Sequence, residues 1–148
     1  MPVKQELIHI VNGCINANRD SQKEFYKLYY GYSMGVCMRY CDSQDDAMEV
    51  VNDGFLKIFR SISSFSPRSE NYEASLMAWL KSIMVHTAID HYRKKKNSYL
   101  VKGIEETHHE LSDASESALD MMSYKEIMVL LQGLSPVYRT VFNLYVID

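Results

Sequence analysis

The sequence predicts an all-α protein. Val, Ile and aromatic residues recur at helical spacing throughout the 148 residues, and no segment alternates as a half-buried strand would. Hydrophobic residues make up 47% of the chain, enough for a core, and the length suits one domain or one domain with a fragment. The clearest helical pattern lies in 42–65, where apolar residues follow one another at steps of three and four. They are Met48, Val51, Phe55, Ile58 and Ile62.

Two helices are expected before that stretch. The first spans 4–16 and turns Leu7, Val11, Cys14 and Ile15 inward. The second begins at Ser21, with Glu24 completing a capping box. The buried stripe expected for the second helix is Phe25, Leu28, Tyr29, Tyr32, Val36 and Tyr40. Its many tyrosines fit either stacking on nucleic-acid bases or packing in the core. Most of them lie on the apolar face, which favours packing.

Charge divides the chain into a basic and an acidic part. Residues 1–102 carry 14 Lys and Arg against 11 Asp and Glu, a net charge of +3, whereas residues 103–148 carry 2 against 8, a net charge of −6. No apolar run predicts a membrane span and no signal peptide is visible, so we expect a cytoplasmic protein. Cys14, Cys37 and Cys41 match neither a disulfide framework nor a metal half-site, and we expect buried thiols.

The helix within 42–65 has a clear start and an unusual polar face. The Ser43 hydroxyl can accept from a free backbone N–H, and Asp46 lies at the positive end of the helix. Asp46, Glu49 and Asp53 then form an acidic stripe, with Asn52 between the last two. The stripe is either a solvated helix face or a docking surface for a basic partner.

The order of residues favours docking. From Asp46 the chain reads DAMEVVNDGFL, which resembles the core-polymerase-binding helix of bacterial sigma factors, with the pattern Asp-Ala-x-Asp-Leu-x-Gln-Glu-x-Phe-Leu. Glu49, Asn52 and Asp53 stand for Asp, Gln and Glu, so the chemistry is kept rather than the identity. The resemblance implies that these three residues bind core RNA polymerase, and we add Asp46 because it belongs to the same stripe.

A helix over 75–97 is expected after the loop 66–73. One of its faces carries Leu76, Trp79, Leu80, Ile83, Met84 and Thr87, and a polar stripe carries Ser82, His86, Asp90 and Arg93. The helix ends in the basic tract RKKK, which is either a solvated terminus or a nucleic-acid contact.

Two segments of this helix, AWLKSI from Ala78 and AIDHYRKK from Ala88, resemble the promoter-melting helix of sigma factors. They follow the polymerase-binding motif at the right distance, and the combination points to the extracytoplasmic-function (ECF) group. The resemblance implies that promoter DNA is bound by the loop 66–75 and by His86, Asp90, Arg93, Lys94, Lys95 and Lys96. The family usually has Asn where this chain has His86, so no base preference is carried over.

His86, Asp90 and His91 could also be taken for a metal site. His86 and Asp90 have the helical spacing i, i+4, but no third ligand stands at a recognisable spacing. A contact from Asp90 to Arg93 or Lys94 is favoured instead. The sequence contains no nucleophile–base pair, no phosphate-binding glycine loop and no paired metal motif, so we expect no enzyme, metal or cofactor. The rival interpretations are a helical protein-interaction adaptor without DNA binding and a helical metal-dependent enzyme.

The resemblance divides the chain into three parts. Residues 1–97 form the helical bundle of sigma region two, 98–116 an acidic linker, and 117–148 a truncated two-helix piece of region four without its helix-turn-helix. Its helices are expected over 117–132 and 136–147, with Ser135 as cap and Pro136 first. Too small to bury a core, they should dock on region two, pair with a second copy or be mobile. We expect an ECF sigma factor that binds core RNA polymerase, promoter DNA and an anti-sigma factor.

Overall fold

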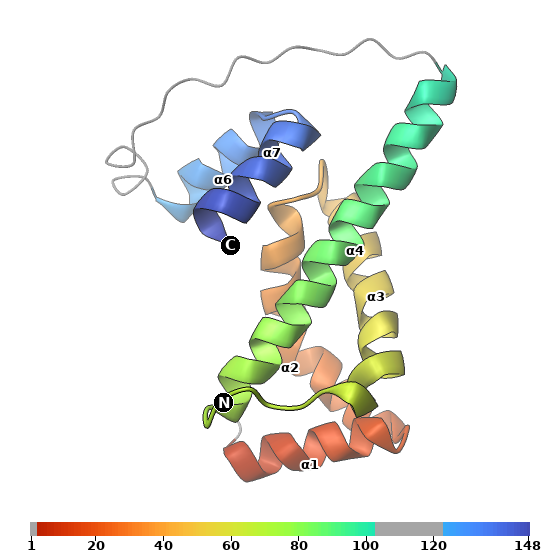
Figure 1. Cartoon of the computed structure of the whole chain (residues 1–148), viewed down its shortest axis with the longest axis vertical. Helices are drawn as coiled ribbons and strands as arrows, with labels where there is room; N and C mark the ends of the chain where they lie inside the picture. Colours follow the sequence, from red (N-terminus) through yellow and green to blue (C-terminus); the bar gives the residue numbers. More distant parts are fainter. Residues whose placement is uncertain (1–2, 103–122) are drawn as a thin grey trace.

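The structure is a computed structural model that describes residues 3–102 and 123–148, with the backbone alone described for 96–102. Every regular element within those ranges is a helix, which confirms the predicted fold class. None of the described helices is both long and apolar enough to cross a membrane. Figure 1 shows α1 lying across one end of the α2, α3 and α4 bundle, with α6 and α7 beside the other end.

The first two helices are α1, Lys4–Ile15, and α2, Arg19–Met38. The inward position predicted for Ile15 is wrong, because this last residue of α1 is 42% exposed. The predicted start of α2 at Ser21 is wrong. Asn18 is the capping residue, and its side-chain oxygen accepts from the backbone N–H of Ser21 at 3.0 Å. An Asn in extended conformation caps a helix as well as Ser does, so the helix begins two residues earlier than the Ser–Glu pattern suggests.

Helix α3, Gln44–Ser61, starts where the sequence predicts. Ser43 caps it, because its hydroxyl accepts from the N–H of Asp46 at 3.1 Å. A short 3-10 turn, η1, Ile62–Ser64, follows. Met48 was placed on the buried face, but it is 40% exposed, whereas Ala47 and Val50 are fully buried. The buried face is therefore rotated slightly towards Ala47 and Val50, since α3 is covered by α2 on one side and α4 on the other.

Helix α4, Tyr72–Lys102, is longer at both ends than the expected 75–97. The Asn71 side chain accepts from the N–H of Ala74 at 3.0 Å and marks an earlier start, inside the segment expected to be loop. The backbone stays helical through 98–102, the first residues of the expected linker. Residues 103–116 of that linker lie outside the described ranges.

Aromatic rings from α2 and α3 fill the centre of the bundle. Phe25 packs edge-on against Phe55 and Phe59, at ring-centroid distances of 6.4 and 5.9 Å. Tyr29 and Tyr40 are buried, so core packing is confirmed for them, but Leu28, expected in the same stripe, is 37% exposed. All three cysteines are free and buried, as expected. Burial raises the pKa of Cys14 to about 11 and the pKa values of Cys37 and Cys41 to about 12, which leaves the thiols unreactive.

The C-terminal piece consists of α6, Tyr124–Gly133, α7, Pro136–Phe142, and a π-helical turn, η2, Asn143–Ile147. Ser135 caps α7 and Pro136 is its first residue, as predicted. One continuous helix over 117–132 is not what the structure shows, because Ser123 is extended and caps α6. Residues 117–122 of that expected helix lie outside the described part of the chain.

This piece docks on the end of α2 through polar side chains. Gln132, Asn143 and Arg139 donate to the backbone carbonyls of Met38, Arg39 and Tyr40 in turn. The last carbonyls of a helix have no partner within it, so the C-terminal piece caps α2. The buried Arg139 guanidinium also donates to the Asp42 carboxylate at 2.7 Å. Docking on region two, one of the three expected arrangements, is thus observed.

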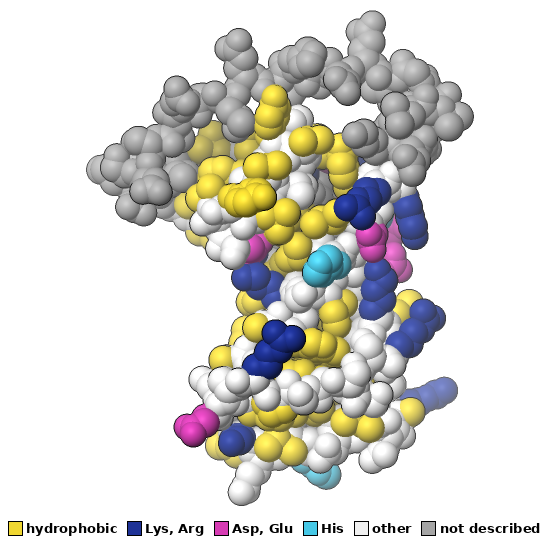
Figure 2. Space-filling view, in the orientation of Figure 1, with side chains coloured by type: hydrophobic (Ala, Val, Ile, Leu, Met, Phe, Trp, Pro, Cys, Tyr) yellow, Lys and Arg dark blue, Asp and Glu magenta, His cyan; other side chains and the backbone are white. Residues whose placement is uncertain are grey.

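The docked piece leaves much of its apolar surface uncovered. Figure 2 shows hydrophobic side chains gathered over α6 and α7 on the face it displays. Leu131 is buried, but several apolar residues are between 48% and 85% exposed. They include Tyr124, Val129, Leu130, Val137, Val141 and Tyr145.

Candidate functional site

Three of the four residues predicted to bind polymerase lie on the outer face of α3. Glu49, Asn52 and Asp53 are exposed, and the last two lie one helical turn after Glu49. Asn52 also contacts α2, because its side-chain oxygen accepts from the Tyr26 hydroxyl at 3.1 Å. That bond fixes the amide so that its N–H donors remain available to a partner. The three side chains can accept and donate hydrogen bonds at one exposed surface, which we call the α3 face.

Asp46, the fourth predicted residue, points towards α4 instead. Lys95 donates to its Oδ2 at 2.6 Å, and His91 Nε2 lies 3.8 Å from its Oδ1. The hydrogen bond from Lys95 has the largest effect on the Asp46 carboxyl and holds its pKa below the ordinary value of 3.8. Asp46 is therefore ionised at neutral pH and engaged in joining α3 to α4.

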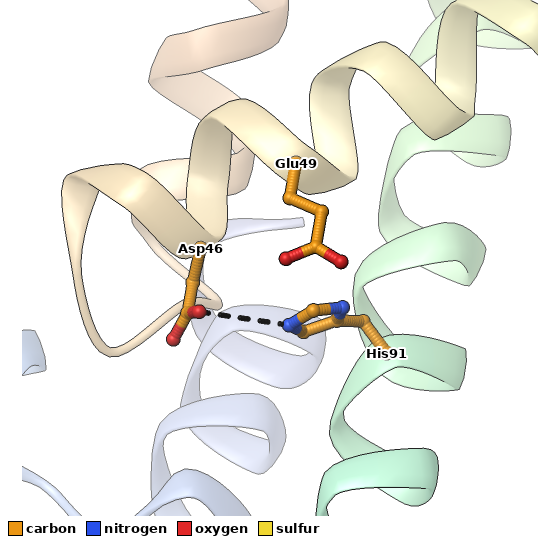
Figure 3. Close-up of side chains that lie close together, drawn as sticks. All are labelled: Asp46, Glu49 and His91. Carbon is orange, nitrogen blue, oxygen red and sulfur yellow. Dashed lines mark ion pairs between the residues drawn. The ribbon is translucent and has the colours of Figure 1, made fainter.

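Asp46, Glu49 and His91 form a close cluster. Figure 3 shows the two carboxylates of α3 and the imidazole of α4 turned towards one another. One ligand atom from each lies within 4.8 Å of the others, which makes the group a candidate for a metal ion. The Lys95 ammonium already neutralises the Asp46 carboxylate, so the charge that would attract a dication is reduced. The cluster fits an ion-pair network better than a metal centre.

The polar stripe of α4 is exposed, as predicted. His86 hydrogen-bonds through Nδ1 to the backbone carbonyl of Ser82 at 2.7 Å, and Asp90 lies 3.8 Å from Arg93. The expected Asp90–Arg93 contact is thus confirmed. Asp90 also lies 3.8 Å from Lys57 of α3, a contact that local spacing does not reveal. The Arg93 side chain is 72% exposed and Lys94 is exposed too, so both can reach phosphates.

The rest of the basic tract behaves differently. Lys95 bends back over α3, where it contacts Asp42 at 3.7 Å in addition to Asp46. Lys96 lies within α4, but its side chain is outside the described part. The tract predicted to be a uniform DNA contact is therefore divided, since Arg93 and Lys94 point outward whereas Lys95 pairs with acids.

The loop before α4 is anchored at both ends. Arg68 donates its backbone N–H to the Ser75 hydroxyl at 3.2 Å, and Ser69 lies 3.1 Å from the same oxygen. The rings of Phe65 and Trp79 lie 5.3 Å apart at the base of the loop. The loop therefore sits on aromatic packing next to the start of α4.

Sequence reasoning missed the partners that reach these residues from other helices. The sequence pattern relates His91 only to His86 and Asp90 on its own helix, and it does not predict the contact of Lys57 with Asp90. His91 and Lys95 are 45 and 49 residues from Asp46, so no spacing rule links them. The alternating acids and the tract RKKK were the only available signal, and they did not say which residues pair.

Comparison with known proteins assigns the family. The profile of sigma-70 region 2 matches residues 25–98, half of the chain and the part that carries both the α3 face and the α4 stripe. RNA polymerase sigma factor SigV of Bacillus subtilis (strain 168) is 30% identical over 141 residues, which cover 88% of this chain and 74% of that protein.

RNA polymerase sigma factor YlaC of the same organism is 30% identical over 77 residues, 52% of this chain and 42% of that protein. No solved structure matches the chain. Sigma factors initiate transcription and are not enzymes. Membership of this family therefore replaces the rival interpretation of the chain as a helical metal-dependent enzyme. The chain belongs to the sigma-70 family of RNA polymerase sigma factors, in the extracytoplasmic-function group whose motifs its sequence resembles.

Proposed function

We propose that this sigma factor binds core RNA polymerase through Glu49, Asn52 and Asp53 and uses α4 to bind and open promoter DNA. The observation that carries the proposal is the α3 face. Its three polar side chains are exposed together. Among the described residues no Lys or Arg forms an ion pair with either carboxylate, although the carboxylate of Glu49 also faces the His91 imidazole. Two unneutralised carboxylates beside an amide suit a basic partner surface.

The DNA-binding part of the proposal rests on the α4 stripe. Arg93 and Lys94 are directed outward and contact phosphates, while His86 faces the bases of the melted strand. Asp90 positions Arg93 and Lys57 through its two ion pairs. Lys95 has a positioning role in place of the predicted DNA contact, because its ammonium is held by Asp46 and Asp42. Lys96 keeps the role that the resemblance implies.

The two surfaces act as one unit because ion pairs join α3 to α4. Lys57, near the end of α3, meets Asp90, and Lys95 meets Asp46 near the start of α3. The docking of α3 on polymerase thereby fixes where the α4 stripe meets DNA. Pre-organisation of this kind reduces the entropy lost on binding.

The test is the binding of core polymerase by the variant Glu49→Lys with Asp53→Lys. Both side chains are exposed, so the variant should fold, and reversing two charges should abolish binding. A lost charged contact costs about 2–5 kcal/mol when it is buried in the interface and much less at a rim. The matched control is Glu6→Lys with Glu24→Lys, which makes the same charge change at exposed positions of α1 and α2.

Polymerase binding that is kept in the first variant, or lost equally in the control variant, contradicts the proposal.

The DNA part is tested in holoenzyme with Arg93→Ala and Lys94→Ala. Their loss should flatten the salt dependence of promoter opening by about 0.7 per lost phosphate contact on a log–log plot. The control is Lys23→Ala with Lys27→Ala on the exposed side of α2.

The anti-sigma factor that the resemblance implies stays a prediction.

A further inference from the structure

Three donor groups, two from the residues that follow α2 and one from α4, converge on the Asp148 carboxylate. Arg39, at the end of α2, donates through Nη2 to Asp148 Oδ1 at 2.9 Å, and Lys81 of α4 lies 3.2 Å from the same oxygen. The Tyr40 hydroxyl donates to the other oxygen, Oδ2. The side chains of Asp148 and Arg39 are only 9% and 11% exposed. A guanidinium, an ammonium and a phenol thus surround a single, nearly buried anion.

The donors and the anion belong to different parts of the protein. Arg39, Tyr40 and Lys81 lie within the matched region 25–98, whereas Asp148 comes from the docked C-terminal piece. Among the described residues, Asp148 is the acidic partner of Arg39 and of Lys81 alike. A guanidinium that is mostly out of water is unfavourable without an anion. Undocking of the C-terminal piece would remove both this anion and the side chains that cover Arg39, and would leave Arg39 and Lys81 open to another anion.

The chemistry of this site suits a phosphate. Arginine presents a planar fork that matches phosphate oxygens, and lysine adds a point charge that binds a third oxygen. The site also holds its anion in the ionised form. Burial would raise the pKa of Asp148, but the hydrogen bonds from Arg39 and Tyr40 outweigh burial and keep the pKa below the ordinary value of 3.8.

The site adjoins the proposed DNA surface. Lys81 directly precedes Ser82, the first residue of the α4 stripe, whose carbonyl accepts from the exposed His86, so the backbone of α4 joins the site to the start of the stripe. DNA bound along α4 would bring its phosphates to this end of the helix.

We propose that Arg39, Tyr40 and Lys81 form a binding site for a DNA backbone phosphate, which the Asp148 carboxylate occupies while the C-terminal piece is docked. The proposal rests on the proposed DNA binding by α4. Docking of the C-terminal piece and binding of that phosphate exclude one another, so the docked piece weakens DNA binding. A DNA strand displaces the carboxylate and releases the piece.

The experiment measures binding of a labelled oligothymidylate strand to the full chain by fluorescence anisotropy, over a series of salt concentrations. Asp148→Asn removes the competing charge and keeps the shape of the side chain. Affinity at low salt should rise about tenfold, the order of magnitude expected for a hydrogen bond to a charged group. The log–log salt slope should steepen by about 0.7, one added phosphate contact on a single strand.

Adding Lys81→Gln to Asp148→Asn should remove most of the gain, whereas adding Lys23→Gln, an exposed lysine of α2, should not. Asp20→Asn, which removes one exposed carboxylate at the start of α2, controls for net charge alone. The proposal is overturned if Asp148→Asn changes neither affinity nor slope, or if Asp20→Asn gives an equal gain. Either result would mean that the Asp148 contacts only hold the C-terminal piece in place and have no part in DNA binding.

Failure of the proposed function is seen separately. If Arg93→Ala with Lys94→Ala leaves strand binding unchanged, the α4 stripe is not the DNA surface, whatever Asp148→Asn does. Circular dichroism of each variant shows that α1 to α4 stay folded.

Discussion

Lys95 of α4 donates to Asp46 of α3 at 2.6 Å, so two residues predicted for different surfaces are partners in one ion pair. Asp46 was assigned to polymerase and Lys95 to DNA, each from the pattern of its own helix. The side chains of Asp46 and Lys95 are 21% and 33% exposed, so the ion pair is neither fully exposed nor fully buried. The pair instead holds together the two helices that carry the proposed binding surfaces.

The first prediction concerns the contribution of this pair to stability. A double-mutant cycle with Asp46→Asn and Lys95→Met, followed by urea unfolding, should give a coupling free energy of about 1 kcal/mol, the upper end for partly exposed pairs. Lys94→Met is the control, because the neighbouring lysine is exposed on α4. A coupling near zero would mean that the pair holds geometry without adding stability.

A second prediction follows from the carboxyl groups whose pKa values are lowered. The Lys95 hydrogen bond lowers the pKa of Asp46, and for Asp148 the bonds from Arg39 and Tyr40 outweigh the opposing effect of burial. Both groups bind protons less tightly in the folded state than in the unfolded state. Their stabilisation is thus complete well above the ordinary value of 3.8 and is lost as the pH falls through the lower folded values.

The free energy of unfolding should therefore fall as the pH is lowered from about 5 to about 3. In Asp46→Asn with Asp148→Asn, the fall should be smaller, because neither amide titrates. Urea unfolding at a series of pH values measures both slopes. An unchanged slope in the double variant would assign the acid sensitivity to other carboxylates.

The third prediction concerns the docking of the C-terminal piece. Arg139 is 2% exposed and donates to the carbonyls of Leu131, Leu134 and Tyr40 as well as to Asp42. Arg139→Met should leave those groups without their donor, at a cost of about 1–3 kcal/mol for each one that stays buried. The piece should undock while α1 to α4 stay folded.

Hydrogen exchange measures this outcome by region. Amide protection should fall in α6 and α7 and at the end of α2, and should persist in α3. Lys125→Met, an exposed change on α6, is the control. Global loss of protection would show that the C-terminal piece and the bundle unfold together.

Much of the fold follows from local rules. Ser43 caps α3, Ser135 and Pro136 start α7, and the stripe from Leu76 to Thr87 faces inward, each as its sequence pattern predicts. Local rules were wrong where two residues compete for one role. Asn18 caps α2 in place of Ser21. On α3, Ala47 and Val50 are buried, whereas Met48, which was expected to be buried, is exposed. Only the neighbouring helices decide how far a buried face extends.

The candidate sites divide along the same line. The sequence by itself determined the family, the helices and the exposure of Glu49, Asn52, Asp53 and Arg93, because helical period and residue order are local properties. Only the tertiary structure decided that Asp46 faces Lys95 and that Asp148 fills the site of Arg39 and Lys81. Asp46 and Lys95 are 49 residues apart in the sequence, and Arg39 and Asp148 are 109 residues apart. Charges so far apart in sequence meet only when helix packing brings them together, and no periodicity encodes that distance.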